Sequence, residues 1–473
     1  MSDIKFGTDG WRARIAEDYT FDNVRRVTQG FATYLKRHGL AEKGVVIGYD
    51  QRFLSDFFAA AAAEVMAGNG IRVWLIDHNS PTPVISYSVV ERQAGGAINI
   101  TASHNPPWDN GFKVRDPFGG AIAPDGLKEI EAAIPSIEDV KRTDIAEAEA
   151  QELVTRWDPD IAYIKHLGEL VDLDKLRNAG LKILVEPMWG NGAGWFPRLL
   201  GGGNNTIIEV HAERHPLFPE MKRPEPIRPN IDVALKRTVE VGADVLLIMD
   251  GDADRMGIGD ENGVYIDQLR AYGLLAYYLL EIRGLRGPII KTISTTKMLN
   301  RLGEMYGVEV YETGVGFKYI APKVRETNAL IGGEESGGYA FRGNVPERDG
   351  ILGNLYFLDF MVQTGKKPSQ LLEDLFEKMG KSYHYKRIDT RFPAEKRPAA
   401  KARLDSAKPT SIAGQPVTDI VTIDGYQYIL GDKGWLLIRF SGTEPIIRVY
   451  CELTDPTIVD AVLDGGLELA GLK

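Results

Sequence analysis

The sequence has almost no cysteine, since Cys451 is the only one among 473 residues. A single thiol excludes an intramolecular disulfide framework, and its apolar neighbours in the run IIRVYCEL predict a buried, unreactive side chain. Long apolar runs are also missing, so no segment is predicted to span a bilayer. The first residues show no apolar core followed by a small-residue cleavage site. We therefore expect a cytoplasmic protein without a membrane partner.

The chain also lacks the basic excess that nucleic-acid binding requires, because its formal net charge is −10. A small phosphorylated ligand remains compatible with this charge, since a local arginine and lysine cluster can make a positive pocket in an acidic protein. No GxxxxGK[ST] sequence is present, which argues against a nucleotide as phosphate donor. With 44% hydrophobic and 26% charged residues and no low-complexity tract, the composition predicts a globular protein of two to four domains.

Short apolar runs alternate with helix-like stretches through most of the chain, which predicts a strand and helix rhythm typical of α/β sheets. The rhythm runs through three rounds, with predicted strands at 44–50, 71–77 and 95–103, at 181–187, 206–212 and 243–250, and at 288–294, 308–314 and 329–335. The last hundred residues instead alternate in period two before a closing helix at 457–471, which predicts an α+β unit. We expect three related α/β/α domains and a smaller C-terminal α+β domain, at 1–148, 149–262, 263–375 and 376–473.

Polar residues follow a predicted strand at 101–114, in the segment TASHNPPWDNGFKV, which we interpret as a loop. Ligands of open α/β sheets bind where loops leave the carboxyl ends of strands. Ser103 is therefore a candidate phosphate carrier, with His104 beside it and Lys113 available to neutralise a phosphate. The alternative is an ordinary polar turn, whose serine and asparagine satisfy only the backbone.

Three acidic residues alternate after another predicted strand, in DGDADR at 250–255. Asp250, Asp252 and Asp254 can turn toward one hard cation, and carboxylate oxygens suit Mg²⁺ or Ca²⁺. An EF-hand is disfavoured, because Arg255 occupies the glycine position and the loop follows a strand. A loop of solvated acids without a metal is the other alternative. Arg255 would supply a phosphate contact.

Two further loops carry ligand-like side chains. GGEESGG at 332–338 offers glycines for close approach and polar groups for sugar hydroxyls, although a glycine-rich turn is an alternative. RFSGTEPIIRVY at 439–450 places turn amides and hydroxyls between two arginines, which suits a phosphate cradle, and a plain hairpin with exposed arginines is an equal alternative. The candidate substrate-binding residues are Glu334, Ser336, Arg439, Ser441, Gly442, Thr443 and Arg448.

Six segments taken together resemble the motif set of the α-D-phosphohexomutases, the phosphoglucomutase and phosphomannomutase family. They occur in the family's order and span nearly the whole chain: FGTDGWR (6–12), TASHNP (101–106), DGDADR (250–255), TGVGFK (313–318), GGEESGG (332–338) and RFSGTEP (439–445). The resemblance implies four domains around a central cleft, the last of them mobile and binding the substrate's phosphate.

By the same resemblance, Ser103 carries a phosphoryl group, and one of its phosphate oxygens completes a Mg²⁺ shell formed with Asp250, Asp252 and Asp254. Lys113 and Arg12 would offset negative charge during transfer. The resemblance also assigns the sugar hydroxyls to the 332–338 loop and the distal phosphate to the 439–448 segment.

The reaction implied by this resemblance interconverts a hexose 1-phosphate and a hexose 6-phosphate through a 1,6-bisphosphate. Glucose is the expected sugar, with glucose 1,6-bisphosphate as activator and intermediate. Phosphomannomutase and dual-specificity activity are alternatives, and amino sugars are less favoured. A phosphosugar phosphatase or a non-catalytic phosphosugar-binding protein would be the rival readings. The periodicity of apolar residues in the sequence reveals no subunit interface, so the oligomeric state, monomer or homo-oligomer, stays open.

One position departs from some family members, which have histidine at the end of a GExSGH sugar loop where this chain has Gly338. Proton transfer by that histidine is therefore not available. Lys318 in TGVGFK becomes the first candidate for general acid or base, and His104 is the second. A lysine would need a lowered pKa to act as a base near neutral pH.

Overall fold

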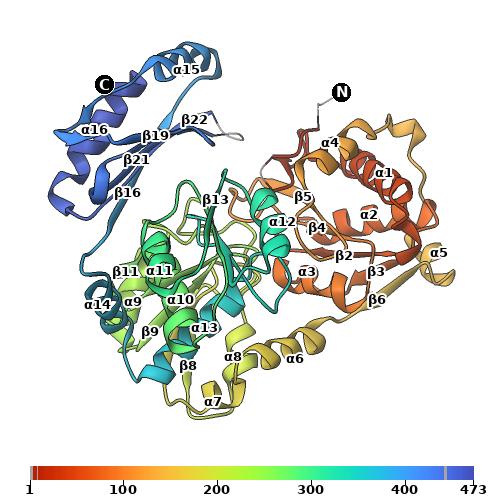
Figure 1. The fold of residues 1–473 in the computed structure, drawn as a ribbon. Coiled ribbons are helices and arrows are strands. Elements are labelled where there is room, and N and C mark those ends of the chain that lie inside the picture. The colour runs from red at the N-terminus through yellow and green to blue at the C-terminus, as the bar shows by residue number, and fades with distance from the viewer. Residues whose placement is uncertain (1–3, 8, 442–444) are drawn as a thin grey trace.

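The computed structural model describes residues 4–7, 9–441 and 445–473. Figure 1 shows four units, with the first (red to orange) on the right, two central units, and a C-terminal unit (blue) at the upper left. Three of the four main sheets mix parallel and antiparallel pairs, and the last is wholly antiparallel. The expected combination of three α/β units and a smaller α+β unit is confirmed. Within the described ranges, no helix combines the length and the apolar character that crossing a membrane requires.

The first sheet has six strands in the order β1-β5-β4-β2-β3-β6. Val45 and Ile47 pack into one core cluster with Phe31 and Phe58 from covering helices, whereas Val46 packs on the other face against Ile85. Successive side chains of a strand point to opposite faces, which places helices on both sides of the sheet. The elements are β1 (Trp11–Arg14), β2 (Val45–Tyr49), β3 (Val73–Ile76), β4 (Ala97–Ile100), β5 (Asp109–Arg115), β6 (Val154–Trp157), α1 (Phe21–Arg37), α2 (Ser55–Gly68), α3 (Thr82–Glu91), α4 (Pro124–Ala132) and α5 (Ile145–Ala150).

Two features of this sheet differ from the sequence interpretation. The predicted loop at 101–114 ends early, because residues from Asp109 onward form β5, antiparallel to β4. Lys113 therefore projects from a strand. In addition, β6 pairs with β3, so the chain leaves the first sheet after Trp157 and residue 148 lies within that unit. The strand β6 is a half-exposed edge with the sequence VTRW, which lacks a clear apolar pattern.

The second and third sheets have the orders β11-β10-β9-β7-β8 and β13-β12-β14-β15. One apolar cluster joins these two units, and it includes Leu247 of β9, Ile289 of β12 and Leu355 of α13. The elements are α6 (Asp160–Leu170), α7 (Leu173–Arg177), β7 (Lys182–Glu186), α8 (Trp195–Leu200), β8 (Thr206–Glu209), α9 (Asp232–Val241), β9 (Val245–Met249), β10 (Met256–Gly259), β11 (Tyr265–Ile266), α10 (Gln268–Tyr277), β12 (Ile289–Thr292), α11 (Met298–Tyr306), β13 (Val310–Thr313), α12 (Phe317–Thr327), β14 (Ile331–Gly333), β15 (Tyr339–Phe341), α13 (Gly350–Thr364) and α14 (Pro368–Met379).

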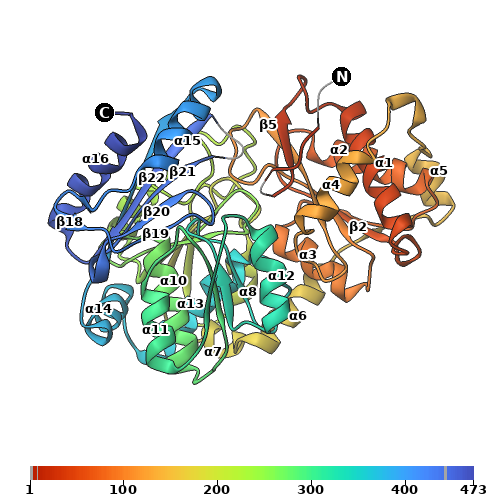
Figure 2. The ribbon, with the colours of Figure 1, turned by 45° about the horizontal axis from the view of Figure 1, so that its top comes forward.

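The fourth sheet is antiparallel, in the order β16-β22-β21-β20-β19. Leu436 and Ile438 of β21 face the unit's own core, whereas Trp435 and Leu437 pack with Ile293 of the third unit. Alternate side chains of β21 therefore pack on opposite faces of the sheet, one in the unit's own core and one against the third unit. Figure 2 shows the fourth unit lying beside the third. Its elements are β16 (His384–Arg391), α15 (Arg397–Ser406), β17 (Ser411–Ile412), β18 (Gln415–Pro416), β19 (Asp419–Val421), β20 (Tyr426–Ile429), β21 (Gly434–Phe440), β22 (Ile446–Leu453) and α16 (Val459–Ala470).

Candidate functional site

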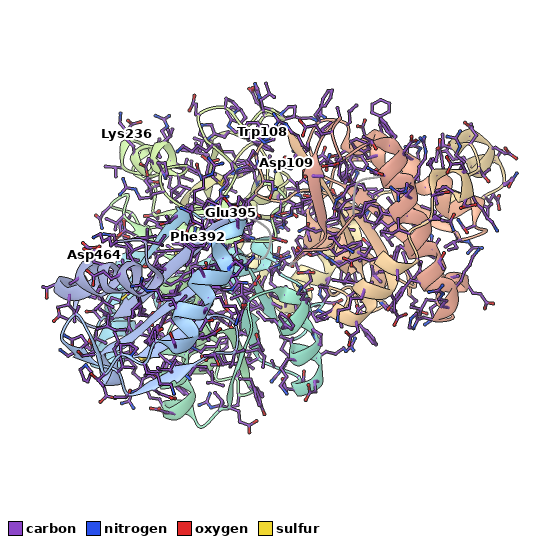
Figure 3. All side chains as sticks on the ribbon, turned by 90° about the horizontal axis from the view of Figure 1, so that it is seen from above. Trp108, Asp109, Lys236, Phe392, Glu395 and Asp464 are labelled. Atoms are coloured by element: carbon purple, nitrogen blue, oxygen red, sulfur yellow. The ribbon has the colours of Figure 1, made fainter. Side chains whose placement is uncertain are left out.

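A cavity of about 580 Å³ is lined by residues of all four units. Figure 3 views the molecule from above, with Asp109 of the first unit on one side and Phe392 and Glu395 of the fourth on the other. The loops that leave β4, β9, β14 and β21 supply part of the polar lining, as expected at the carboxyl ends of strands: His104, Arg255, Glu334, Glu335, Ser336 and Ser441. The charged and hydroxyl residues of the lining include Asp9, Arg12, His104, Arg223, Glu225, Arg255, Glu334, Glu335, Ser336, Arg348, Arg387, Arg439, Ser441 and Arg448.

Ser103 sits beneath one end of this cavity, fully buried, in the left-handed region with φ 51°. Its hydroxyl donates to Asp250 Oδ2 at 2.8 Å and lies 3.1 Å from His104 Nδ1. Arg52, which no motif singled out, is 1% exposed and donates to the carbonyl oxygens of Ser103 and Asn105 at 2.6 Å. A buried guanidinium bound to several carbonyl groups holds the serine in this uncommon conformation.

The three predicted metal ligands are brought together, with ligand atoms of Asp250, Asp252 and Asp254 within 4.8 Å of one another. All three are fully buried, and among the described residues the Oδ1 atoms of Asp252 and Asp254 find no hydrogen-bond donor. Burial and the two neighbouring carboxylates raise the pKa of Asp250 well above its usual value. Crowded buried carboxylates with unused oxygen atoms fit a hard divalent cation such as Mg²⁺.

Lys113 reaches the same carboxylates from β5. Its ammonium group lies 2.9 Å from Asp252 Oδ2, 3.1 Å from Asp254 Oδ2 and 2.8 Å from Asp9 Oδ2. Burial alone would lower the pKa of Lys113, but these carboxylates raise it above its usual value, so the amine is a fixed cation. Its charge also lowers the pKa of Asp252, against the opposing effect of burial.

Arg348 is a second buried cation at this position, and no sequence motif indicated it. The guanidinium donates to Asp9, lies 2.9 Å from Asp254 Oδ2 and 3.6 Å from Glu334 Oε2, and covers the Phe317 ring. It therefore connects the carboxylate cluster of the second unit to the sugar loop of the third. Asp9 belongs to FGTDGWR, but that motif drew attention only to Arg12.

The candidate acid and base groups occupy different positions. His104 lines the cavity, and burial together with nearby Arg255 and Arg12 lowers its pKa well below the usual value, so the ring is neutral. Arg12 donates to Asn105 Oδ1 at 2.7 Å and also lines the cavity. Lys318 is absent from the lining and donates to the Gly7 carbonyl oxygen at 3.3 Å; burial lowers its pKa.

The sugar loop presents Glu334 and Ser336 to the cavity. Burial is the main cause that raises the pKa of Glu334 to about 7, and the Ser336 hydroxyl is buried without a hydrogen-bond partner in the described structure. The glycine in place of the histidine lies close to Arg348. A β-carbon at Gly338 would lie 2.3 Å from Cδ of Arg348, so a side chain at that position would require the arginine to move.

At the opposite end of the cavity, Arg439 of β21 and Arg448 of β22 stand in register across the two strands. Ser441 also lines the cavity. Gly442 and Thr443 lie outside the described residues. Arg255 lies between the two ends, with Nη1 3.8 Å from Glu225 Oε1 and Nε 3.9 Å from Asp250 Oδ2.

Comparisons with known proteins identify the family of the chain. The chain matches the phosphoglucomutase/phosphomannomutase family throughout, with α/β/α domain I at residues 3–141, domain II at 161–263, domain III at 269–379 and the C-terminal domain at 392–465. The chain belongs to this family, the α-D-phosphohexomutases, and is a phosphohexomutase, an isomerase of phosphorylated hexoses.

The relatives do not share one sugar. The chain is 31% identical to a phosphoglucomutase/phosphomannomutase of Thermococcus kodakarensis, over 98% of both chains. It is 29% identical to a phosphoglucosamine mutase of Roseobacter denitrificans, again over 98% of both. A crystal structure from Thermus thermophilus, of a phosphomannomutase-type protein, superposes with a TM-score of 0.86 at 32% identity and covers 99% of each chain.

Proposed function

We propose that this phosphohexomutase interconverts glucose 1-phosphate and glucose 6-phosphate through a phosphoserine at Ser103 and glucose 1,6-bisphosphate. The supporting observation is one cavity with a charged group at each end. Ser103, Lys113 and the three aspartates lie beneath the wall that contains His104, Asp9 and Arg255, which they contact, and Arg439 and Arg448 line the wall of the fourth unit. A molecule with phosphate groups at both ends of a hexose matches this arrangement.

The proposed catalytic cycle consists of two phosphoryl transfers. The phosphorus bond to the Ser103 oxygen breaks as a bond forms to the free hydroxyl of the bound hexose monophosphate, and the hydroxyl proton passes to a base. The bisphosphate then turns end over end, its other phosphoryl group returns to Ser103, and the isomeric monophosphate leaves. Lys113 and Arg12 offset the charge at the transfer end, while Arg439, Ser441 and Arg448, with Gly442 and Thr443, hold the second phosphate.

Asp250, Asp252 and Asp254, with Ser103, would hold Mg²⁺. When bound, the ion would supply positive charge to the transferring phosphoryl group. The chain itself contributes the orientation of the ligands, because Thr82 donates to Asp252 at 2.7 Å and the Arg255 backbone amide donates to Asp250 at 3.1 Å. These hydrogen bonds fix two of the carboxylates independently of any cation.

Lys318 and His104 are the two candidates for the proton transfer. The geometry supports His104 more, since its neutral ring lines the cavity 3.1 Å from Ser103 Oγ. Lys318 would have to leave the Gly7 carbonyl oxygen to reach the substrate. Separate Lys318→Met and His104→Asn variants distinguish the two, because loss of the true base lowers kcat and removes one limb of its pH profile.

A coupled assay tests the proposal. It supplies Mg²⁺ and a trace of glucose 1,6-bisphosphate, and it compares glucose 1-phosphate, mannose 1-phosphate and glucosamine 1-phosphate as substrates. We expect glucose to give the highest kcat/KM, because GEES is more typical of glucose-preferring members. A higher value for mannose or glucosamine would reassign the sugar. Release of inorganic phosphate without isomerisation would contradict the mutase mechanism.

A further inference from the structure

Asp424 joins two parts of the cavity wall that belong to different units. It lies in the turn between β19 and β20 and was not part of any motif. Its Oδ2 atom accepts from Arg439 Nε at 2.9 Å, within the fourth unit, and from the backbone N–H of Val315 at 2.9 Å, in the third unit. Both Arg439 and Val315 line the cavity. One carboxylate oxygen therefore ties a phosphate-facing arginine to the neighbouring loop.

The turn is shaped to bring Asp424 and Arg439 together. Gly425 has φ +105°, and a β-carbon there would lie 2.6 Å from the Ile438 carbonyl oxygen and 3.2 Å from Arg439 Cβ. Only glycine allows this close approach of the turn to β21. The Asp-Gly pair thus places the carboxylate against the Nε edge of the guanidinium and leaves the two Nη atoms as the donors for an anion in the cavity.

The charges of the two neighbouring arginines give a second reason for a carboxylate at position 424. Arg439 and Arg448 are cross-strand partners, and like charges in directly opposite positions repel each other. The carboxylate of Asp424 balances the charge of Arg439, and Asp389 Oδ2 lies 3.5 Å from Nε of Arg448. With its Nε held, the Arg439 guanidinium keeps one orientation before the ligand arrives, which reduces the entropy lost on binding.

The contact with Val315 extends the connection beyond the fourth unit. Val315 precedes α12, whose Lys318 donates to the Gly7 carbonyl oxygen of the first unit. Movement of the fourth unit away from the third would break the Val315 hydrogen bond, so the carboxylate that contacts Arg439 would lose its tie to the third unit. Phosphate binding and docking of the fourth unit therefore favour each other through one shared acceptor.

We propose that Asp424 is a positioning residue that couples docking of the fourth unit on the third to phosphate binding by Arg439. The inference rests on the proposed function, because it takes the phosphate of a hexose phosphate as the ligand of this arginine. Asp424 acts through Arg439 and the loop at Val315 and does not touch the reacting atoms.

The test measures binding of glucose 6-phosphate by calorimetry, and steady-state kinetics, for Asp424→Ala and Asp424→Asn. Asp405→Asn is the matched control, since Asp405 accepts from the Tyr426 hydroxyl beside the same turn and does not touch Arg439. We expect Asp424→Ala to weaken binding and raise KM on the order of 10-fold, the range for a hydrogen bond to a charged group. Asp424→Asn should have a smaller effect, and the control should stay within about twofold.

A double-mutant cycle with Arg439→Ala separates positioning from a general structural role. If Asp424 acts through this arginine, adding Asp424→Ala to Arg439→Ala should cost clearly less than about 10-fold. Full additivity, unchanged binding by Asp424→Ala, or an equal loss in Asp405→Asn would overturn the inference. Failure of the unsubstituted protein to bind any hexose phosphate would instead overturn the proposed function, and the inference with it.

Discussion

The two ends of the cavity differ in burial and in how their charges are balanced. At the transfer end, which comprises Ser103, Lys113, Asp250, Asp252 and Asp254, every side chain is fully buried. At the anchor end, which comprises Asp424, Arg439 and Arg448, side-chain exposures are 30%, 7% and 18%. Electrostatic interactions are stronger away from water, so the buried end suits phosphoryl transfer and the more open end suits capture and release.

The difference also separates two ways of holding charge. The transfer end keeps cations and carboxylates in fixed mutual contact before any ligand binds, so little reorganisation accompanies the reaction. The anchor end depends on contacts between units, such as Asp424 with Val315 and Arg387 with Glu335 at 3.0 Å. Substitutions at the transfer end should therefore lower kcat, whereas those at the anchor end should raise KM.

Replacing Ser103 with alanine should have the largest effect. We expect turnover to fall by at least about 10⁴-fold, because the phosphate carrier is lost, while binding of glucose 6-phosphate changes little. Coupled kinetics and calorimetry on the same preparation measure both quantities. Ser88→Ala is the control, since Ser88 is a buried serine whose hydroxyl donates to the Val84 carbonyl oxygen, away from the cavity. Retained mutase activity in Ser103→Ala would rule out the phosphoserine mechanism.

Arg348→Met should have the next largest effect, and it tests whether the buried charges of the transfer end contribute to turnover. Removing the guanidinium leaves Asp9, Asp254 and Glu334 with less positive charge, and we expect kcat to fall on the order of 100-fold. Glucose 6-phosphate kinetics and thermal unfolding together measure the change. Arg301→Met, on the surface of α11 and paired only with Glu304 in the described structure, is the control. A rise in KM alone would place Arg348 with the anchor end instead.

Arg439→Lys addresses the anchor end directly. Lysine keeps the positive charge, but it lacks the planar guanidinium that can bind Asp424 through one edge and a phosphate through another. We therefore expect KM to rise on the order of 10-fold while kcat changes less than about threefold. Steady-state kinetics with glucose 1-phosphate measure the two constants. Arg403→Lys, on α15 and donating to the Glu468 carbonyl oxygen, is the control outside the cavity. A dominant loss of kcat would break the proposed division between the two ends.

The sequence predicted the parts of the site that follow strands. Strand β9 is an unbroken apolar run before DGDADR, and β4 is a buried, largely apolar run before TASHNP, so the pattern alone predicts both loops at the sheet edge. The motif resemblance supplied the order of the remaining loops. The family and the four-unit architecture were confirmed, whereas the residue roles remain predictions.

What sequence reasoning missed are contacts between residues far apart in the chain. Arg348 and Asp9 are 339 positions apart, and nothing local marks either as a partner of the other. Arg52 and Asp424 act on carbonyl, amide and guanidinium groups of other segments, which no periodicity reveals. The sequence of strand β5, DNGFKVR, begins with turn-forming residues, and for that reason the pattern predicts a loop there.

Glu334→Gln tests a charge in the sugar loop through the pH dependence of stability. Burial raises the pKa of Glu334 to about 7 from an ordinary value of 4.5, so the folded protein keeps a proton that the unfolded chain loses in this interval. The glutamate therefore lowers stability progressively from about pH 4.5 to about 7, by up to about 3 kcal/mol at about 1.4 kcal/mol per pH unit.

Glutamine has no such titration, so Glu334→Gln should gain stability relative to the unsubstituted protein as the pH rises from about 5 to about 8. Unfolding midpoints of both proteins, measured in the absence of hexose phosphate, give this difference. Glu335→Gln is the neighbouring control, although it also weakens the contact with Arg387. A constant difference between the two proteins across this range would show that Arg348 keeps Glu334 ionised, which would make the sugar loop an extension of the charged transfer end.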